Sequence, residues 1–258
     1  MMAATSAAYA APYYDSIDDI VKVENGQTTA WTDVANIPTS QPTESYAIAK
    51  DGEGTLPYTG QGTIYTTVYV REGEMQFGDG STETSVTFRP TSYNAQGRYN
   101  ALSIGGTDAV VRFNKANANC NETANMIGGH NGNGTLIIEN GSHVDFAGSN
   151  VFVIGDISIE EMTDPATGIP DGYTNATTAQ AGASVDTADN LYKGNYSTAQ
   201  NGSGATFGRG DVTVKDGSYF RATYGNFWIA EGTLNVDGED TQVDVALNGY
   251  GYRTWLGL

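Results

Sequence analysis

A short pattern recurs along the sequence and restricts the folds that the chain can adopt. Two apolar residues with one residue between them are followed by one or two polar residues and then by glycine. Copies lie at Val21–Gly26, Val68–Gly73, Leu136–Gly141, Val212–Gly217 and Leu234–Gly238. Alternation with a period of two residues is typical of β-strands, and Asn-Gly and Asp-Gly favour turns in which φ is positive. The pattern therefore predicts strands that each end in the same kind of turn.

A second apolar pattern interleaves with the first. Its copies centre on Ile104, Ile127, Ile154, Ile229 and Leu256. Successive copies have similar spacing, except for a much longer gap between Ile154 and Ile229. Recurrence at about 20–30 residues marks a stacked repeat, in which each unit buries its apolar edge against its neighbours. We therefore predict an all-β fold, a parallel β-helix (β-solenoid), as a single domain over residues 15–258.

The alternative fold is a β-sandwich or jelly roll, because these folds also join short strands through glycine turns. They do not require the same turn to recur in register, so the pattern favours the solenoid. The long gap is far wider than one repeat and contains a stretch rich in Ala, Thr, Asn, Gly, Asp and Tyr. We expect a long loop insertion at about residues 160–206.

The N-terminal segment and the charge bear on where the protein acts. Residues 1–14 are rich in alanine and contain Ala8-Tyr9-Ala10, which is similar to a signal-peptide cleavage site. We interpret this segment as a signal-peptide remnant or an N-terminal tail. The formal net charge is −18, from 30 acidic and 12 basic residues. Such a surface repels phosphate backbones, and no apolar run approaches the length of a membrane span. We expect no nucleic-acid partner and no transmembrane span.

Three segments resemble the repeats of autotransporter passenger domains and of secreted bacterial proteins with PEP-CTERM sorting signals. They are Gly134–Val144, Phe152–Gly155 and Gly232–Gly238. The resemblance covers about residues 66–156 and 207–258. It implies a parallel β-helix on a bacterial surface, in adhesion or matrix roles, and it implies no catalytic residues. Residues 255–258 look like the opening of another repeat, which predicts an open end of the stack.

These observations lead us to expect a non-catalytic structural or adhesive protein, located outside the cell or on its surface. Its partners would be further copies of itself, forming filaments through open ends, or surface glycans or proteins. Flat aromatic side chains can stack on sugars or on a neighbouring subunit. The predicted interaction residues are therefore aromatic: Tyr173, Tyr192, Tyr196, Tyr250, Tyr252 and Trp255.

An enzyme acting on polysaccharides, a lyase or a glycosidase, is the alternative function. Glycosidase chemistry needs two carboxylates roughly 5–10 Å apart. Asp145 and Asp244 occupy equivalent positions of the repeat, but Arg221 occupies that position in the copy between them. The sequence therefore predicts a ladder of mixed charge, and we expect no catalytic residue.

No cofactor is expected, with calcium as the one candidate. Asp79, Asp237 and Asp240 lie in acidic turns, and clustered carboxylates can bind calcium. Their surroundings match no known calcium-binding loop, and carboxylates exposed to solvent are the simpler interpretation. His130 lies in a glycine-rich turn without a second histidine at ligand spacing. Cys120 is the only cysteine, which excludes an intramolecular disulfide.

Overall fold

The computed structural model describes residues 19–35, 37–40, 46–90, 100–119, 124–128, 133–146, 151–154, 209–223, 226–229, 232–246 and 254–256. The predicted N-terminal segment 1–14 and the predicted insertion 160–206 lie outside these residues. The described part is all-β, as predicted, apart from one short 3-10 helix, η1 (Trp31–Asp33). No helix within it has the length and hydrophobicity that crossing a membrane requires.

The described strands form two parallel sheets, and the larger sheet divides into two stacks because β5 and β7 bend. The first stack contains β1 (Asp19–Lys22), β2 (Ala47–Asp51), the first halves of β5 (Thr67–Phe77) and β7 (Asn100–Asn114), β9 (Ala124–Ile127), β12 (Val151–Ile154), β15 (Asn226–Ile229) and β18 (Thr254–Leu256). The second stack contains β3 (Thr55–Tyr58), the second halves of β5 and β7, β10 (Gly134–Glu139), β13 (Gly210–Lys215) and β16 (Gly232–Asp237). The third stack is the smaller sheet: β4 (Gln61–Ile64), β6 (Thr84–Phe88), β8 (Ala116–Asn119), β11 (His143–Asp145), β14 (Tyr219–Thr223) and β17 (Gln242–Ala246).

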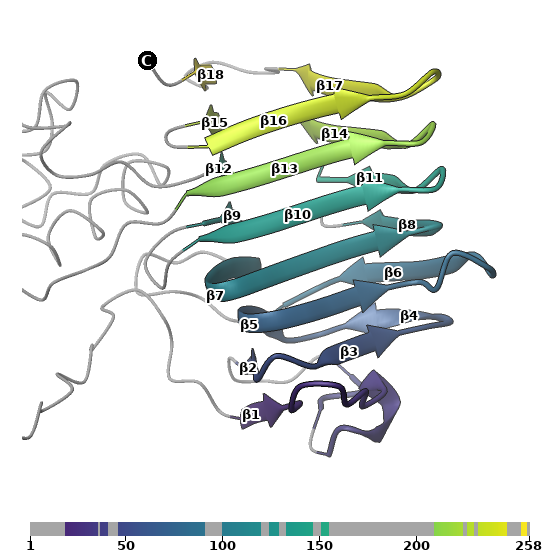
Figure 1. Ribbon diagram of the computed structural model, residues 1–258, viewed down its shortest axis with the longest axis vertical. Coiled ribbons are helices and arrows are strands. Elements are labelled where there is room, and N and C mark those ends of the chain that lie inside the picture. The colour runs from purple at the N-terminus through teal and green to yellow at the C-terminus, as the bar shows by residue number, and fades with distance from the viewer. Residues whose placement is uncertain are drawn as a thin grey trace, which may run out of the picture.

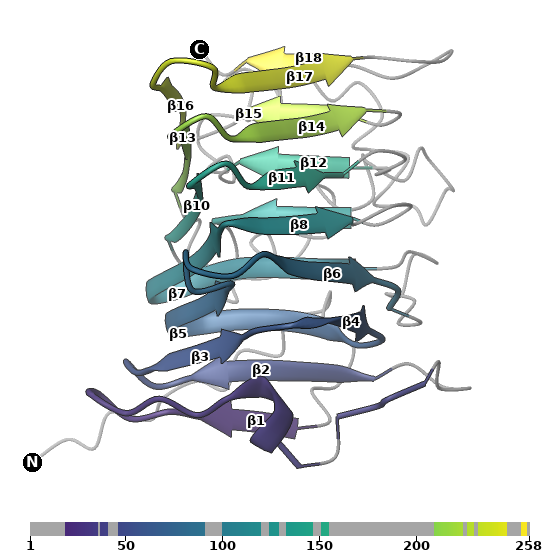
Figure 2. The same ribbon diagram turned by 90° about the vertical axis from the view of Figure 1, so that its right-hand side faces the viewer.

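The second and third stacks rise together along the long axis of the molecule. Their strand orders are β3-β5-β7-β10-β13-β16 and β4-β6-β8-β11-β14-β17. We call each pair of strands joined by a turn between these two stacks a layer, and we call β16–β17 the C-terminal layer. Figures 1 and 2 show the strands following one another from β1 at one end to β17 and β18 at the other. Every pairing between the named strands is parallel, unlike the antiparallel sheets of a sandwich.

The turns between the second and third stacks explain the recurring glycine. Asn140 and Gly141 have φ of 56° and 68°, and Asp216 and Gly217 have nearly the same values, 56° and 69°. Positive φ at two successive positions favours an Asn-Gly or Asp-Gly pair. The register of β10, β13 and β16 is also as the pattern predicts, because Gly134 pairs with Gly210, and Gly210 with Gly232.

Two copies of the first pattern, however, do not lie in the second stack with the other three. Val68 and Val70 pair with Leu102 and Ile104, in the first stack. Val21 of β1 lies in the same stack, where it pairs with Lys50, which in turn pairs with Val70. The reason is that β5 bends at Gly73, where φ is 65°. A bend within a strand and a turn after a strand both need positive φ, so the same spacing of apolar residues and glycine describes both.

The second pattern is confirmed as one column of the first stack. Ile104, Ile127, Ile154, Ile229 and Leu256 follow one another in register. Strands β12 and β15 are therefore neighbours, although a long stretch of sequence separates Ile154 from Ile229. The stack continues in the same register across the segment that the sequence marks as an insertion.

The core lies between the three stacks and consists of their inward residues. Leu136, Ile138 and Val144 are fully buried, and each such side chain stabilises the fold by about 1.5–3 kcal/mol. The ring of Phe77 stacks on that of Phe113, with centroids 4.8 Å apart and planes inclined by 12°. At the N-terminal end, Trp31 of η1 is 8% exposed and packs against Tyr58, so this end of the core is covered.

Candidate functional site

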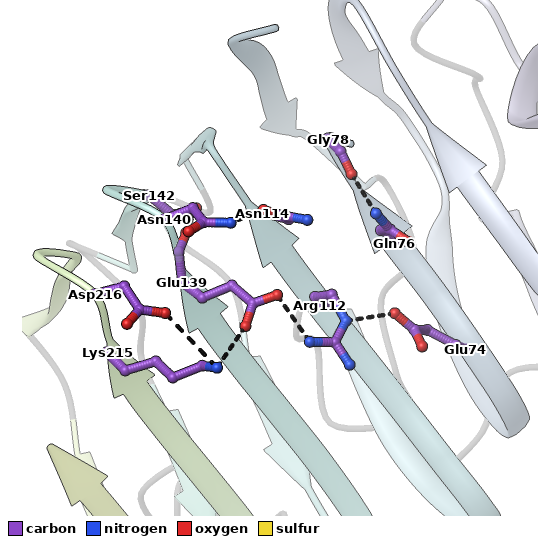
Figure 3. A network of polar contacts seen from close by, with 10 residues as sticks. All are labelled: Glu74, Gln76, Gly78, Arg112, Asn114, Glu139, Asn140, Ser142, Lys215 and Asp216. Carbon is purple, nitrogen blue, oxygen red and sulfur yellow. Dashed lines mark hydrogen bonds and ion pairs between the residues drawn. The ribbon is translucent and has the colours of Figure 1, made fainter. Parts of the chain in front are cut away.

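A row of alternating charge crosses the outer face of the second stack. Arg112 Nε donates to Glu74 Oε1 at 2.7 Å, and Arg112 Nη1 donates to Glu139 Oε1 at 2.8 Å. Lys215 Nζ lies 2.9 Å from Glu139 Oε2. Figure 3 shows how these side chains from β5, β7, β10 and β13 reach across the strands. The row ends with Asp237 of β16, which is in register with Lys215.

Glu139 is the most enclosed member of this row, with 8% of its surface exposed. Burial acts to raise the pKa of its carboxyl group, but the hydrogen bonds from Lys215 and Arg112 outweigh burial, so the pKa lies below its ordinary value. The same hydrogen bond raises the pKa of Lys215. Glu139 is therefore ionised at neutral pH, and it links its own layer to the layers on both sides through Arg112 and Lys215.

The outer face of the third stack carries a second row. Asp145, Arg221 and Asp244 lie in register on β11, β14 and β17. Arg221 donates to both carboxylate oxygens of Asp145, with Nε 3.0 Å from Oδ1. The hydroxyl of Tyr219 donates to Asp244 Oδ2 at 3.4 Å, and its ring lies 4.6 Å from that of His143. The predicted ladder of mixed charge is confirmed, and an arginine separates the two carboxylates.

The first stack repeats the arrangement near its N-terminal end. Lys22 is in register with Asp51, and Arg71 donates to both carboxylate oxygens of Asp51, at 2.7 and 2.5 Å. Charge thus alternates in sign within one row of each of the three stacks. Facing like charges destabilise paired strands, whereas facing opposite charges stabilise them. The rows consequently specify the order of the layers as well as holding them together.

Lys50 is buried where the first stack turns toward the second. It occupies an inward position of β2, in register with Val21 and Val70, and is 0% exposed. Its ammonium group donates to the carbonyl oxygens of Gly52, Gly54 and Glu72, the last two at 2.6 Å. Burial lowers the pKa of Lys50 to about 8. Neither apolar pattern indicated this residue, because the position is apolar in the other copies.

The C-terminal layer differs from the layers below it. Val236 is 51% exposed, whereas Ile138 and Val214, in register with it, are both 0% exposed. Among the described strands, β16 pairs only with β13, and β17 only with β14. Within the described residues, the layer therefore presents apolar side chains and one unpaired strand edge in each of two stacks.

The predicted interaction residues are not brought together in the described part. Tyr173, Tyr192, Tyr196, Tyr250 and Tyr252 lie outside the described residues, as do Cys120 and His130. Trp255 lies on β18, and its backbone is in register with Trp228 of β15. A role for these aromatic residues in binding stays a prediction.

Of the three calcium candidates, Asp79 lies between β5 and β6, apart from Asp237 and Asp240 at the other end of the stacks. Asp79 Oδ1 accepts hydrogen bonds from the backbone N–H and hydroxyl of Ser81 and from the backbone N–H of Thr82. These hydrogen bonds lower the pKa of Asp79 to about 2, and the bond from the Ser81 hydroxyl has the largest effect. Asp237, the last residue of β16, and Asp240, in the turn between β16 and β17, are both exposed. The described residues contain no group of three or more His, Cys, Asp or Glu that could hold a metal ion, and calcium binding stays a prediction.

Comparison with known proteins finds no relative of this chain. No protein-family model matches the chain, and neither curated proteins nor solved structures give a significant match.

Proposed function

We propose that the protein is an exported β-solenoid that serves outside the cell, or on its surface, as a structural or adhesive component. The three parallel stacks in register support a parallel β-helix, because successive stretches of chain contribute to each stack in turn. Its partners are further copies of itself, or surface glycans or proteins. The resemblance to bacterial surface repeats is consistent with this location.

One observation carries the proposal: the C-terminal layer leaves apolar surface and strand edges uncovered. Val236 is 51% exposed, and β16 and β17 each pair on one side among the described strands. An unpaired strand edge beside apolar side chains readily accepts another strand. The proposed role is therefore assembly by addition of strands to this layer, including filament formation by the protein itself.

Sedimentation and negative-stain electron microscopy test the assembly over a range of protein concentrations. We expect association that rises with concentration in the wild type and is lost in Val236→Glu. Asn235→Glu is the matched control, because it adds the same charge at the next, outward position of β16. A wild type that stays monomeric at every concentration would refute self-assembly.

A second function, cleavage of polysaccharides, is favoured by one group of side chains. His143 and Asp145 lie beside Tyr219 and Arg221 on the outer face of the third stack. These groups include the residue types that act as general acids and bases. Release of reducing ends or unsaturated products from a polysaccharide panel, abolished by Asp145→Asn, would support it. Absence of product from every polysaccharide in the panel would rule out this second function.

A further inference from the structure

From the β10–β11 layer to the C-terminal layer, the charge rows of the second and third stacks alternate in sign from one layer to the next, and both rows carry the same sign within each layer. Glu139 and Asp145 make the β10–β11 layer acidic, and Lys215 and Arg221 make the β13–β14 layer basic. In the C-terminal layer, Asp237 is in register with Lys215, and Asp244 is in register with Arg221. Both rows therefore end on an acidic layer, and continuing either row calls for a basic one.

The basic layer below already has acidic partners on its other side. Lys215 Nζ lies 2.9 Å from Glu139, and Arg221 binds both carboxylate oxygens of Asp145. Asp237 and Asp244 are exposed. Each aspartate can therefore face a second cation across its free side, as Glu139 does between Arg112 and Lys215.

The apolar side chains of the C-terminal layer call for a covering layer at the same place. Val212, Val214 and Phe220 in the β13–β14 layer are fully buried. Their counterparts Leu234, Val236 and Val243 are only partly buried or exposed. A strand–turn–strand segment laid over β16–β17 would bury these side chains and pair with both free strand edges.

We propose that the C-terminal layer binds a basic strand–turn–strand segment of another protein chain. In that segment aliphatic residues face inward, and Lys or Arg stands opposite Asp237 and Asp244. This inference rests on the proposed function and names the partner of the same surface. The N-terminal end of a second copy fits less well, because Trp31 covers its core and the chain carries a net charge of −18. The charge of the layer therefore predicts tighter binding of a basic partner than of another copy.

The protein contains a sequence that can serve as the probe. Residues 209–223 form the β13–β14 layer, which already lies in register against an acidic layer on both sides. A labelled synthetic peptide of this sequence, titrated with the full-length chain, reports binding by fluorescence anisotropy. The control peptide carries Lys215→Glu and Arg221→Glu and keeps every apolar residue. We expect the native peptide to bind about tenfold more tightly at low salt, with the difference shrinking as salt screens the charges.

Charge-reversal variants of the protein distinguish the effect of the charge rows from the effect of net charge. Asp237→Lys combined with Asp244→Arg should make the protein prefer the control peptide. Glu239→Lys combined with Asp240→Lys changes the net charge equally, in the turn of the same layer, and should keep the preference for the native peptide. Far-UV circular dichroism verifies that both variants are folded. Equal reversal by the two variants would overturn the inference, because net charge alone would then explain binding.

The remaining outcomes distinguish this inference from self-assembly. Peptide binding by a protein that stays monomeric would support the basic partner while removing filament formation. Filaments that form while neither peptide binds at millimolar concentration would support self-assembly and overturn the basic partner. Equal binding of the two peptides would show that apolar contact alone covers the layer, which also overturns it.

Discussion

Replacement of Lys50 by methionine tests whether a buried ammonium group holds the bend between the first two stacks. Lys50 is 0% exposed and donates to three backbone carbonyl oxygens, those of Gly52, Gly54 and Glu72. Methionine has a similar length and fills the same space without a donor. The substitution therefore removes three hydrogen bonds and one buried charge together.

The two effects oppose each other, and their sizes decide the result. Burial lowers the pKa of Lys50 from 10.5 to about 8, and one pKa unit corresponds to about 1.4 kcal/mol, so charging the buried group costs about 3 kcal/mol. Each carbonyl left without a donor costs about 1–3 kcal/mol. We expect Lys50→Met to lower the free energy of unfolding by about 2–4 kcal/mol at pH 7.

The pH dependence gives an independent measure. Below pH 8 Lys50 is charged in both the folded and the unfolded chain, so its burial cost is fully present. Between pH 8 and 10.5 the unfolded chain binds more protons, so the wild type gains up to about 3 kcal/mol relative to Lys50→Met. Urea unfolding followed by circular dichroism measures both quantities. Lys22→Met is the control, because the Lys22 side chain is 62% exposed, and it should leave the stability nearly unchanged. A Lys50→Met variant as stable as the wild type, or a difference that stays constant from pH 8 to 10.5, would refute the reasoning.

Four further substitutions test the stacks, each by urea unfolding. Gly106→Ala should cost about 2–3 kcal/mol, because the added methyl group would overlap a backbone carbonyl of β5; an unchanged midpoint would contradict this close approach. Val214→Ala should cost about 2–3 kcal/mol and Val236→Ala less than about 1 kcal/mol, because the former side chain is 0% and the latter 51% exposed; equal losses would show that Val236 is covered. Arg112→Met should cost about 1–3 kcal/mol at pH 7, because Glu139 loses a partner. Because the pKa of Glu139 lies below its ordinary value, the ion pair stabilises the fold at neutral pH and this contribution is lost as the carboxyl group becomes protonated. The loss should therefore shrink as the pH falls below 4.5, the ordinary pKa of a glutamate, and a constant loss would exclude the ion pair.

The register of the stacks could be predicted from the sequence because one physical requirement repeats in every layer. Inward positions must be apolar, and the turn between stacks must adopt positive φ, so both features recur at fixed spacing. The alignment of Gly134, Gly210 and Gly232 follows directly. The row of Asp145, Arg221 and Asp244 was predictable for the same reason, because alignment of the repeats places them at one position.

Features that break the repeat could not be predicted in this way. Gly73 sits in a bend inside β5, although its sequence context equals that of a turn glycine. Lys50 stands at an inward position where an aliphatic residue was expected, since the carbonyl groups that hold it belong to the bend and not to the strand pattern. The part of the row that runs from Glu74 through Arg112 to Glu139 crosses the strands diagonally, so alignment of equivalent positions does not reveal it.

The acidic composition and the charge rows are connected by the geometry of parallel stacking. Neighbouring strands lie about 4.8 Å apart, so equivalent outward side chains face each other closely and like charges repel. With 30 acidic and 12 basic residues, alternation can be satisfied over only part of the surface. Arg112, Lys215 and Arg221 are placed between acidic residues, where each neutralises the repulsion within a row. In the C-terminal layer Asp237 and Asp244 end the two rows, so a basic partner is the one that continues both rows without placing like charges face to face.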